Sequence, residues 1–143
     1  MPPEELVSDV RFLAHSTLRD GQINMVNDGF NALKNGDFLL ANAPTGIGKT
    51  AASLAAALTI ARSRAGTQVL FLTGRQSQHR IVVDTVRKIN ERIQGNGRNV
   101  TLVDIIGRTS MCKDVDQRTG KCSCEQGIPE SECSNRRFGL INE

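Results

Sequence analysis

The chain has no tryptophan, no tyrosine and only five phenylalanines among its 143 residues. Proteins that bind single strands by stacking need aromatic platforms, so this scarcity argues against base stacking as a main binding mode. The longest apolar run, around residues 54–61, is far too short to cross a bilayer. The first residues, Met-Pro-Pro-Glu-Glu, lack the basic start and apolar core of a signal peptide. We therefore expect a cytoplasmic protein without membrane association.

The most informative stretch reads Ala-Pro-Thr-Gly-Ile-Gly-Lys-Thr and occupies residues 43–50. An apolar, strand-like run precedes it at 38–42, and strong helix formers follow it at 51–58. A strand, a glycine-bearing turn and a helix are the setting of a phosphate-binding loop, whose backbone N–H groups converge on a nucleotide phosphate. The residues expected to bind ATP with Mg²⁺ are Ala43, Pro44, Thr45, Gly46, Ile47, Gly48, Lys49 and Thr50.

Two residues of this stretch are the catalytic candidates. Lys49 is expected to reach the β- and γ-phosphates, and the Thr50 hydroxyl is expected to hold Mg²⁺. Upstream, Arg19 and Gln22 open a predicted helix as Arg-x-x-Gln. A glutamine amide can donate to and accept from one edge of adenine, so Gln22 is expected to contact the ATP base. We include Arg19 and Gln22 among the predicted cofactor-binding residues.

Apolar periodicity predicts helices that alternate with strands along most of the chain. Asp20 is the expected N-cap of the first helix, and Asn35-Gly36 its end. This alternation predicts an α/β fold, with a parallel sheet flanked by helices and joined by right-handed crossovers. The predicted helices cover residues 20–35, 49–63 and 77–92, and the predicted strands cover residues 37–43, 67–73 and 100–106.

Charge is unevenly distributed, although the net charge is only +3. Residues 71–113 carry eight basic and three acidic side chains, whereas residues 1–70 carry six of each. A basic surplus after the second predicted strand suits contact with a nucleic-acid backbone. It suits a solvated helix face equally well, so charge alone leaves both interpretations open.

Four signatures follow one another in an order that resembles the first motor domain of the XPD/DinG family of iron–sulfur superfamily 2 DNA helicases. The resemblance spans roughly residues 19–133. The signatures are Arg19-x-x-Gln22-x-x-Met25, the phosphate-binding loop, the strand Val69 to Thr73 running into Gln78, and Gly107-Arg108 with Met111-Cys112.

The resemblance implies a RecA-like motor domain in residues 1–107 and a truncated, cysteine-rich iron–sulfur segment in residues 108–143. It also implies ATP-driven 5′→3′ translocation on single-stranded or forked DNA. No Asp-Glu-x-His motif occurs in the sequence. We therefore expect the N-terminal part of a longer helicase, inactive by itself. The resemblance places DNA-backbone contacts at Thr73, Arg75, Gln78 and Arg80.

Four cysteines without a secretion signal indicate metal or redox chemistry rather than disulfides. Four thiolates suffice for a [4Fe–4S] cluster or for a tetrahedral zinc ion, and their spacing does not decide between the two. The helicase resemblance favours the iron–sulfur cluster. The alternative function is a non-catalytic nucleotide-binding module with a zinc-bound knuckle for nucleic acid. The predicted metal ligands are Cys112, Cys122, Cys124 and Cys133.

Overall fold

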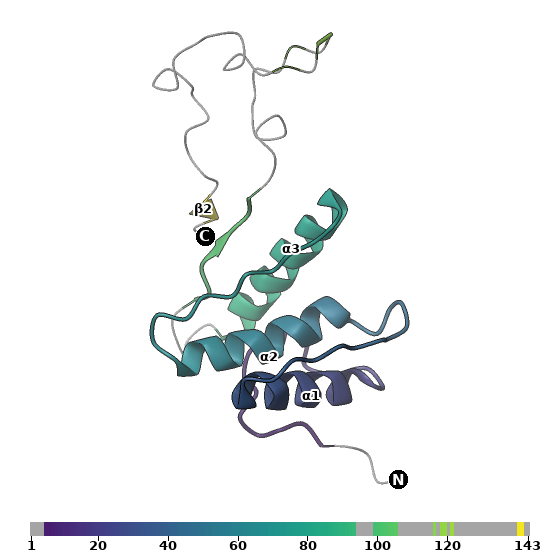
Figure 1. The fold of residues 1–143 in the computed structure, drawn as a ribbon, viewed down its shortest axis with the longest axis vertical. Helices are drawn as coiled ribbons and strands as arrows, with labels where there is room; N and C mark the ends of the chain where they lie inside the picture. Colours follow the sequence, from purple (N-terminus) through teal and green to yellow (C-terminus); the bar gives the residue numbers. More distant parts are fainter. Residues whose placement is uncertain are drawn as a thin grey trace. The chain divides into compact units, whose positions relative to one another are not determined.

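The protein is represented by a computed structural model with two compact units, Met1–Val100 and Thr101–Glu143. The first unit contains three helices, and the described part of the second contains a pair of short strands (Figure 1). The residues that the structure describes are 5–93, 99–105, 116, 118–119, 121 and 140–141. The helices are α1 (Gln22–Asn35), α2 (Lys49–Ser63) and α3 (Gln76–Ile93), and the strands are β1 (Leu102–Val103) and β2 (Leu140–Ile141).

The three predicted helices are confirmed, each within two residues of its predicted ends. The predicted N-cap is wrong, because Gly21 and not Asp20 occupies that position, in the left-handed conformation with φ +73°. A Cβ at Gly21 would lie 3.0 Å from the Ile47 side chain, so the turn has little room for a larger residue. The predicted end is confirmed: Gly36 has φ +80°, and its N–H donates to carbonyls of the last turn.

Helices α1 and α2 pack closely because small residues line their contact. A Cβ added at Gly29 of α1 would lie 3.3 Å from the Ala56 Cβ of α2, which is tighter than ordinary van der Waals contact. Around this point Val26 and Phe30 are almost completely buried. Burial of each large apolar side chain contributes about 1.5–3 kcal/mol. The core consists of Val10, Val26, Phe30, Ala52, Ala55, Ala56 and Ile60.

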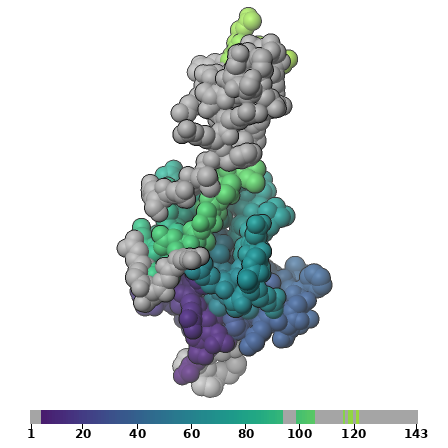
Figure 2. Space-filling view, turned by 90° about the vertical axis from the view of Figure 1, so that its left-hand side faces the viewer, coloured from purple at the N-terminus to yellow at the C-terminus, as the bar shows by residue number. Residues whose placement is uncertain are grey.

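Residues 5–14 form an N-terminal strap that runs along the two helices and is purple in Figure 2. The Asn27 side chain of α1 accepts a hydrogen bond from the Val7 N–H at 3.0 Å. The Thr59 hydroxyl of α2 accepts one from the Arg11 N–H at 3.3 Å. The strap is therefore attached to both helices by their side chains, and it adds Val10, Phe12 and Ala14 to the buried residues.

Helix α3 contacts α2, and its buried residues are Val82, Val86 and Ile89. These residues recur at helical spacing, so the opposite face is left to polar side chains. Near the end of α3, the Asn90 side chain accepts from the Val100 N–H at 2.8 Å and donates to its carbonyl at 3.0 Å. One side-chain amide thereby satisfies both backbone groups of Val100, as a neighbouring strand would.

The predicted parallel sheet is not seen among the residues that the structure describes. Neither residues 37–43 nor residues 67–73 belong to a strand. Side-chain exposure nevertheless alternates along residues 38–40. Phe38 and Leu40 are fully exposed, whereas Leu39 between them is 46% exposed. An apolar run is a local property, but a strand is defined by hydrogen bonds to a neighbour, and the run alone does not supply that neighbour.

The third predicted strand, 100–106, is only partly formed. Within its described residues, β1 covers Leu102–Val103 alone and pairs with β2 in antiparallel orientation, with Leu102 opposite Ile141. The expected parallel arrangement is therefore not seen in this pair. The proposed domain boundary after residue 107 falls among residues outside the described ones, and it stays a prediction.

Candidate nucleotide-binding site

The loop before α2 is shaped by two glycines. Gly46 and Gly48 both have φ +90°, a conformation that side-chain-bearing residues rarely adopt. Gly48 is the N-cap of α2, which begins at Lys49 without a capping side chain and without an acidic residue in its first turn. The N–H groups and the positive dipole end of this first turn therefore remain suited to an anion.

Lys49 lies over the start of the same loop. Its Nζ donates to the Ala43 carbonyl at 2.9 Å and to the Pro44 carbonyl at 3.0 Å, in an exposed setting. A phosphate oxygen carries negative charge, so it attracts the ammonium group more strongly than a neutral carbonyl does. A phosphate at the loop would therefore compete effectively with these carbonyls for the ammonium group.

Arg19 and Gln22 are brought against the loop by the start of α1. The Gln22 side chain is 3% exposed; its Oε1 accepts from the Arg19 N–H at 3.1 Å and its Nε2 donates to the Gly48 carbonyl at 3.2 Å. The Arg19 guanidinium donates to the Gly46 carbonyl. Both residues thus hold the backbone of the loop, a contact that the spacing Arg-x-x-Gln did not reveal. The adenine contact of Gln22 stays a prediction.

The donor set fits a nucleoside triphosphate. Backbone N–H groups of a glycine turn, a helix N-terminus and a lysine ammonium supply positive character without a competing acid in the first turn of α2. The Thr50 hydroxyl, one position further, is the candidate Mg²⁺ ligand of this loop. Among the described residues, no group of three or more His, Cys, Asp or Glu side chains is placed to hold a metal ion.

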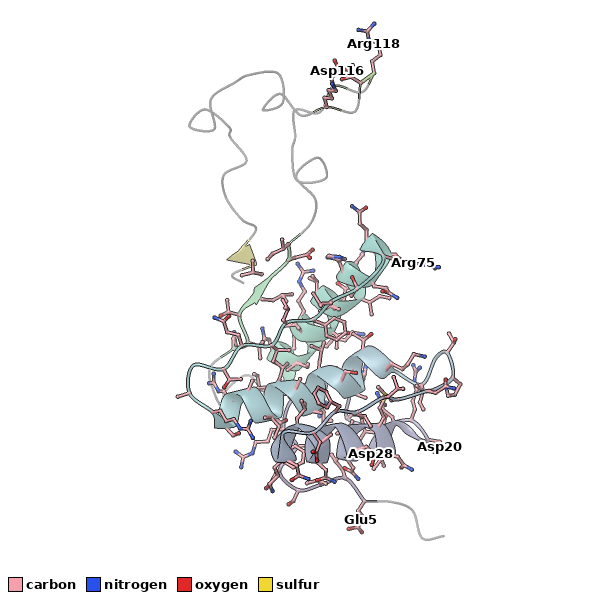
Figure 3. All side chains as sticks on the ribbon, in the orientation of Figure 1. Glu5, Asp20, Asp28, Arg75, Asp116 and Arg118 are labelled. Atoms are coloured by element: carbon pink, nitrogen blue, oxygen red, sulfur yellow. The ribbon has the colours of Figure 1, made fainter. Side chains whose placement is uncertain are left out.

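The predicted DNA-contacting residues lie together where α3 begins. The Thr73 hydroxyl is 3.5 Å from the Arg75 carbonyl, and the Gln78 N–H donates to that carbonyl at 3.0 Å. Arg75 is exposed at the start of α3 (Figure 3). The Arg80 side chain, one turn further, is 89% exposed. The structure therefore gathers these four residues on one stretch of the surface.

The four cysteines lie outside the residues that the structure describes. Between Cys112 and Cys122, Asp116 forms a local turn in which its Oδ1 accepts from the N–H groups of Arg118 at 2.7 Å and Thr119 at 3.1 Å. Figure 3 shows Asp116 and Arg118 in this turn. The cysteine ligand set stays a prediction.

In the part of the chain that the structure describes, no helix has the length and apolar character required to span a membrane.

The loop geometry and its donor set define a P-loop nucleotide-binding protein. The sequence model of the DEAD/DEAH box helicase family matches residues 25–131, about three quarters of the chain. The chain belongs to the DEAD/DEAH box helicase family. This family implies a RecA-like α/β fold, nucleic-acid helicase activity and the use of ATP and Mg²⁺. Comparisons with curated proteins and with solved structures found no match.

Substitution of the two loop glycines tests the contact with Gln22. Gly46→Ala should lower the free energy of unfolding by about 1–2 kcal/mol, since alanine disfavours a left-handed backbone. Gly48→Ala should cost about 1–3 kcal/mol more, because its Cβ would lie 2.5 Å from the Gln22 Nε2 and would separate a buried amide from its partner.

Urea denaturation of both variants and the parent measures this difference. Gly46→Ala is the matched control, because both glycines have φ +90° but a Cβ at Gly46 meets no atom within 4 Å. Equal losses in the two variants would contradict the role given to Gln22.

Proposed function

We propose that this chain is the ATP-binding motor portion of a DNA helicase that resembles the XPD/DinG family. The observation that carries the proposal is the glycine turn at the start of α2 with the Lys49 ammonium gathered over it, in a chain of a helicase family. ATP supplies the free energy for translocation. The residues of this chain bind and orient its phosphates, and the surface at the start of α3 binds the strand.

Lys49 is proposed to exchange the Ala43 and Pro44 carbonyls for phosphate oxygens, which are stronger acceptors. Gly46 and Gly48 present their backbone to the phosphates, since no side chain intervenes. Arg19 and Gln22 keep this curl in place through their hydrogen bonds to the loop carbonyls.

Removal of the lysine charge tests nucleotide binding. Lys49→Ala should weaken binding of ATP with Mg²⁺ by about 10- to 100-fold, because a hydrogen bond to a charged group contributes about 1.5–3 kcal/mol. Isothermal titration calorimetry measures the affinity, and circular dichroism checks that the helices are retained. Lys34→Ala, which removes an equal charge from the end of α1, should bind as the parent does. Equal affinity of Lys49→Ala and the parent would contradict the proposed role of the loop in ATP binding.

The DNA contact is proposed at Thr73, Arg75, Gln78 and Arg80. These residues are close in sequence around the start of α3, and both arginines are exposed. Arginine binds phosphate through several N–H donors, and such backbone contacts carry no base information. The scarcity of aromatic residues supports this mode over base stacking. We infer that a single strand is held at this surface chiefly by its phosphates.

Charge removal at two arginines tests this surface. Arg75→Gln with Arg80→Gln should weaken binding of single-stranded DNA for every base sequence alike. It should also lower the slope of log affinity against log salt by about 0.7 for each lost phosphate contact. Fluorescence anisotropy of labelled oligonucleotides at several salt concentrations measures both quantities. Arg11→Gln with Arg62→Gln is the control with the same net charge. If the double variant at Arg75 and Arg80 keeps the parental affinity and the parental salt slope, this surface does not bind DNA and is an ordinary solvated helix face.

The cysteine segment is proposed to hold a [4Fe–4S] cluster at Cys112, Cys122, Cys124 and Cys133. Support comes from four thiols in one short segment and from the order of signatures shared with the iron–sulfur helicases. Protein purified without oxygen should contain iron and sulfide and absorb visible light, and Cys112→Ser should lower both signals. Colourless protein with one equivalent of zinc would instead favour the nucleotide-binding module with a zinc knuckle.

A further inference from the structure

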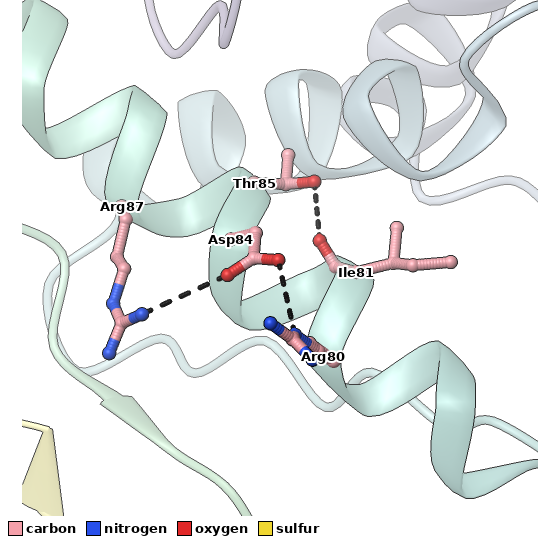
Figure 4. Close-up of polar contacts among 5 residues, drawn as sticks. All are labelled: Arg80, Ile81, Asp84, Thr85 and Arg87. Atoms are coloured by element: carbon pink, nitrogen blue, oxygen red, sulfur yellow. Dashed lines mark hydrogen bonds and ion pairs between the residues drawn. The ribbon is translucent and has the colours of Figure 1, made fainter.

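The basic surface of α3 also carries acidic residues, and Asp84 is the one paired with two of its arginines. Asp84 stands between two arginines of the same helix, as Figure 4 shows. Its Oδ2 is 3.9 Å from the Arg80 Nε, and its Oδ1 is 3.8 Å from the Arg87 Nη1. The spacing i, i+4 and i, i+7 from Arg80 places the three side chains on one face of the helix, opposite the buried Val82 and Val86.

These ion pairs are too loose to fix the arginine side chains. Both distances exceed that of a hydrogen bond, and the Arg80, Asp84 and Arg87 side chains are 89%, 51% and 49% exposed. Exposed pairs of this kind contribute little to stability, because solvent screens them and the long side chains lose conformational freedom. The guanidinium N–H donors therefore remain available to another anion.

The carboxylate nevertheless changes the local field. Two guanidinium groups with one carboxylate between them carry a net charge of one instead of two. A phosphate that approaches either arginine also approaches Asp84 and is repelled by it. Asp84 therefore weakens the attraction between a phosphate and the two neighbouring arginines of α3.

We propose that Asp84 is an internal competitor of the DNA phosphates, which lowers the affinity of the α3 surface for single strands. This inference rests on the proposed function, since it assumes that the arginines of α3 meet a DNA backbone. Asp84 acts through Arg80 and Arg87 as a tuning residue. Because Asp84 lowers the affinity, bound single-stranded DNA is held loosely enough to be exchanged.

The test is the charge-removing variant Asp84→Asn, compared with the parent on labelled single-stranded oligonucleotides by fluorescence anisotropy. At low salt its affinity should rise about threefold, which corresponds to Coulomb repulsion in water over roughly 6 Å. At about 1 M salt, where screening acts over about 3 Å, the two proteins should bind equally. Asp84→Glu keeps the charge and should bind as the parent does. Asp28→Asn, at an exposed site of α1, matches the change in net charge and should have a smaller effect at every salt concentration.

The outcomes separate the two proposals. If Arg75→Gln with Arg80→Gln weakens binding but Asp84→Asn matches Asp28→Asn, Asp84 has no local effect and the inference fails alone. If Asp84→Asn weakens binding, the carboxylate positions the arginines and the inference is overturned. If the parent does not bind DNA, or the double arginine variant binds as tightly as the parent, the DNA surface and the inference fall together. Circular dichroism of each variant confirms that α3 is retained.

Discussion

The arrangement of the nucleotide site depends on one buried amide. A buried side-chain amide needs partners for both its donor and its acceptor, and Gln22 obtains them from the Gly48 carbonyl and the Arg19 N–H. Because a Cβ at residue 48 would lie 2.5 Å from the amide nitrogen, glycine at this position allows the close approach. The contact therefore ties the first turn of α1 to the N-cap residue of α2, while the close packing at Gly29 holds the bodies of the same helices together.

Local sequence patterns predicted the helices and the loop. They did not predict contacts between residues that are far apart in the sequence. The helix 49–63 could be predicted to the residue because good helix formers follow a glycine that ends the loop. The strands 37–43 and 67–73 were predicted from apolar, strand-like runs, which do not specify a pairing neighbour. The hydrogen bond from Gln22 to Gly48 joins residues far apart in the sequence, and Arg-x-x-Gln carries no information about distance.

The two surfaces assigned to anions are built on different principles. At the start of α2 the positive character belongs to the backbone and to one lysine, and its first turn has no acid. On α3 it belongs to long, exposed arginine side chains with Asp84 between two of them. Backbone donors are fixed in place before a ligand arrives, so they suit a phosphate of defined geometry. Arginine side chains adapt to their ligand, so they suit a chain of phosphates that moves past them.

The N-terminal strap also bears on the order of assembly during synthesis. Its Val7 is separated from Asn27 by 20 positions, whereas its Arg11 is separated from Thr59 by 48. A chain made from the N-terminus can close the shorter loop first, at a lower entropic cost, and must wait for α2 to close the longer one. The phosphate-binding loop lies between Asn27 and Thr59 in the sequence. The second attachment of the strap therefore forms only after the loop has emerged, and the loop lies within the stretch of sequence that this contact closes.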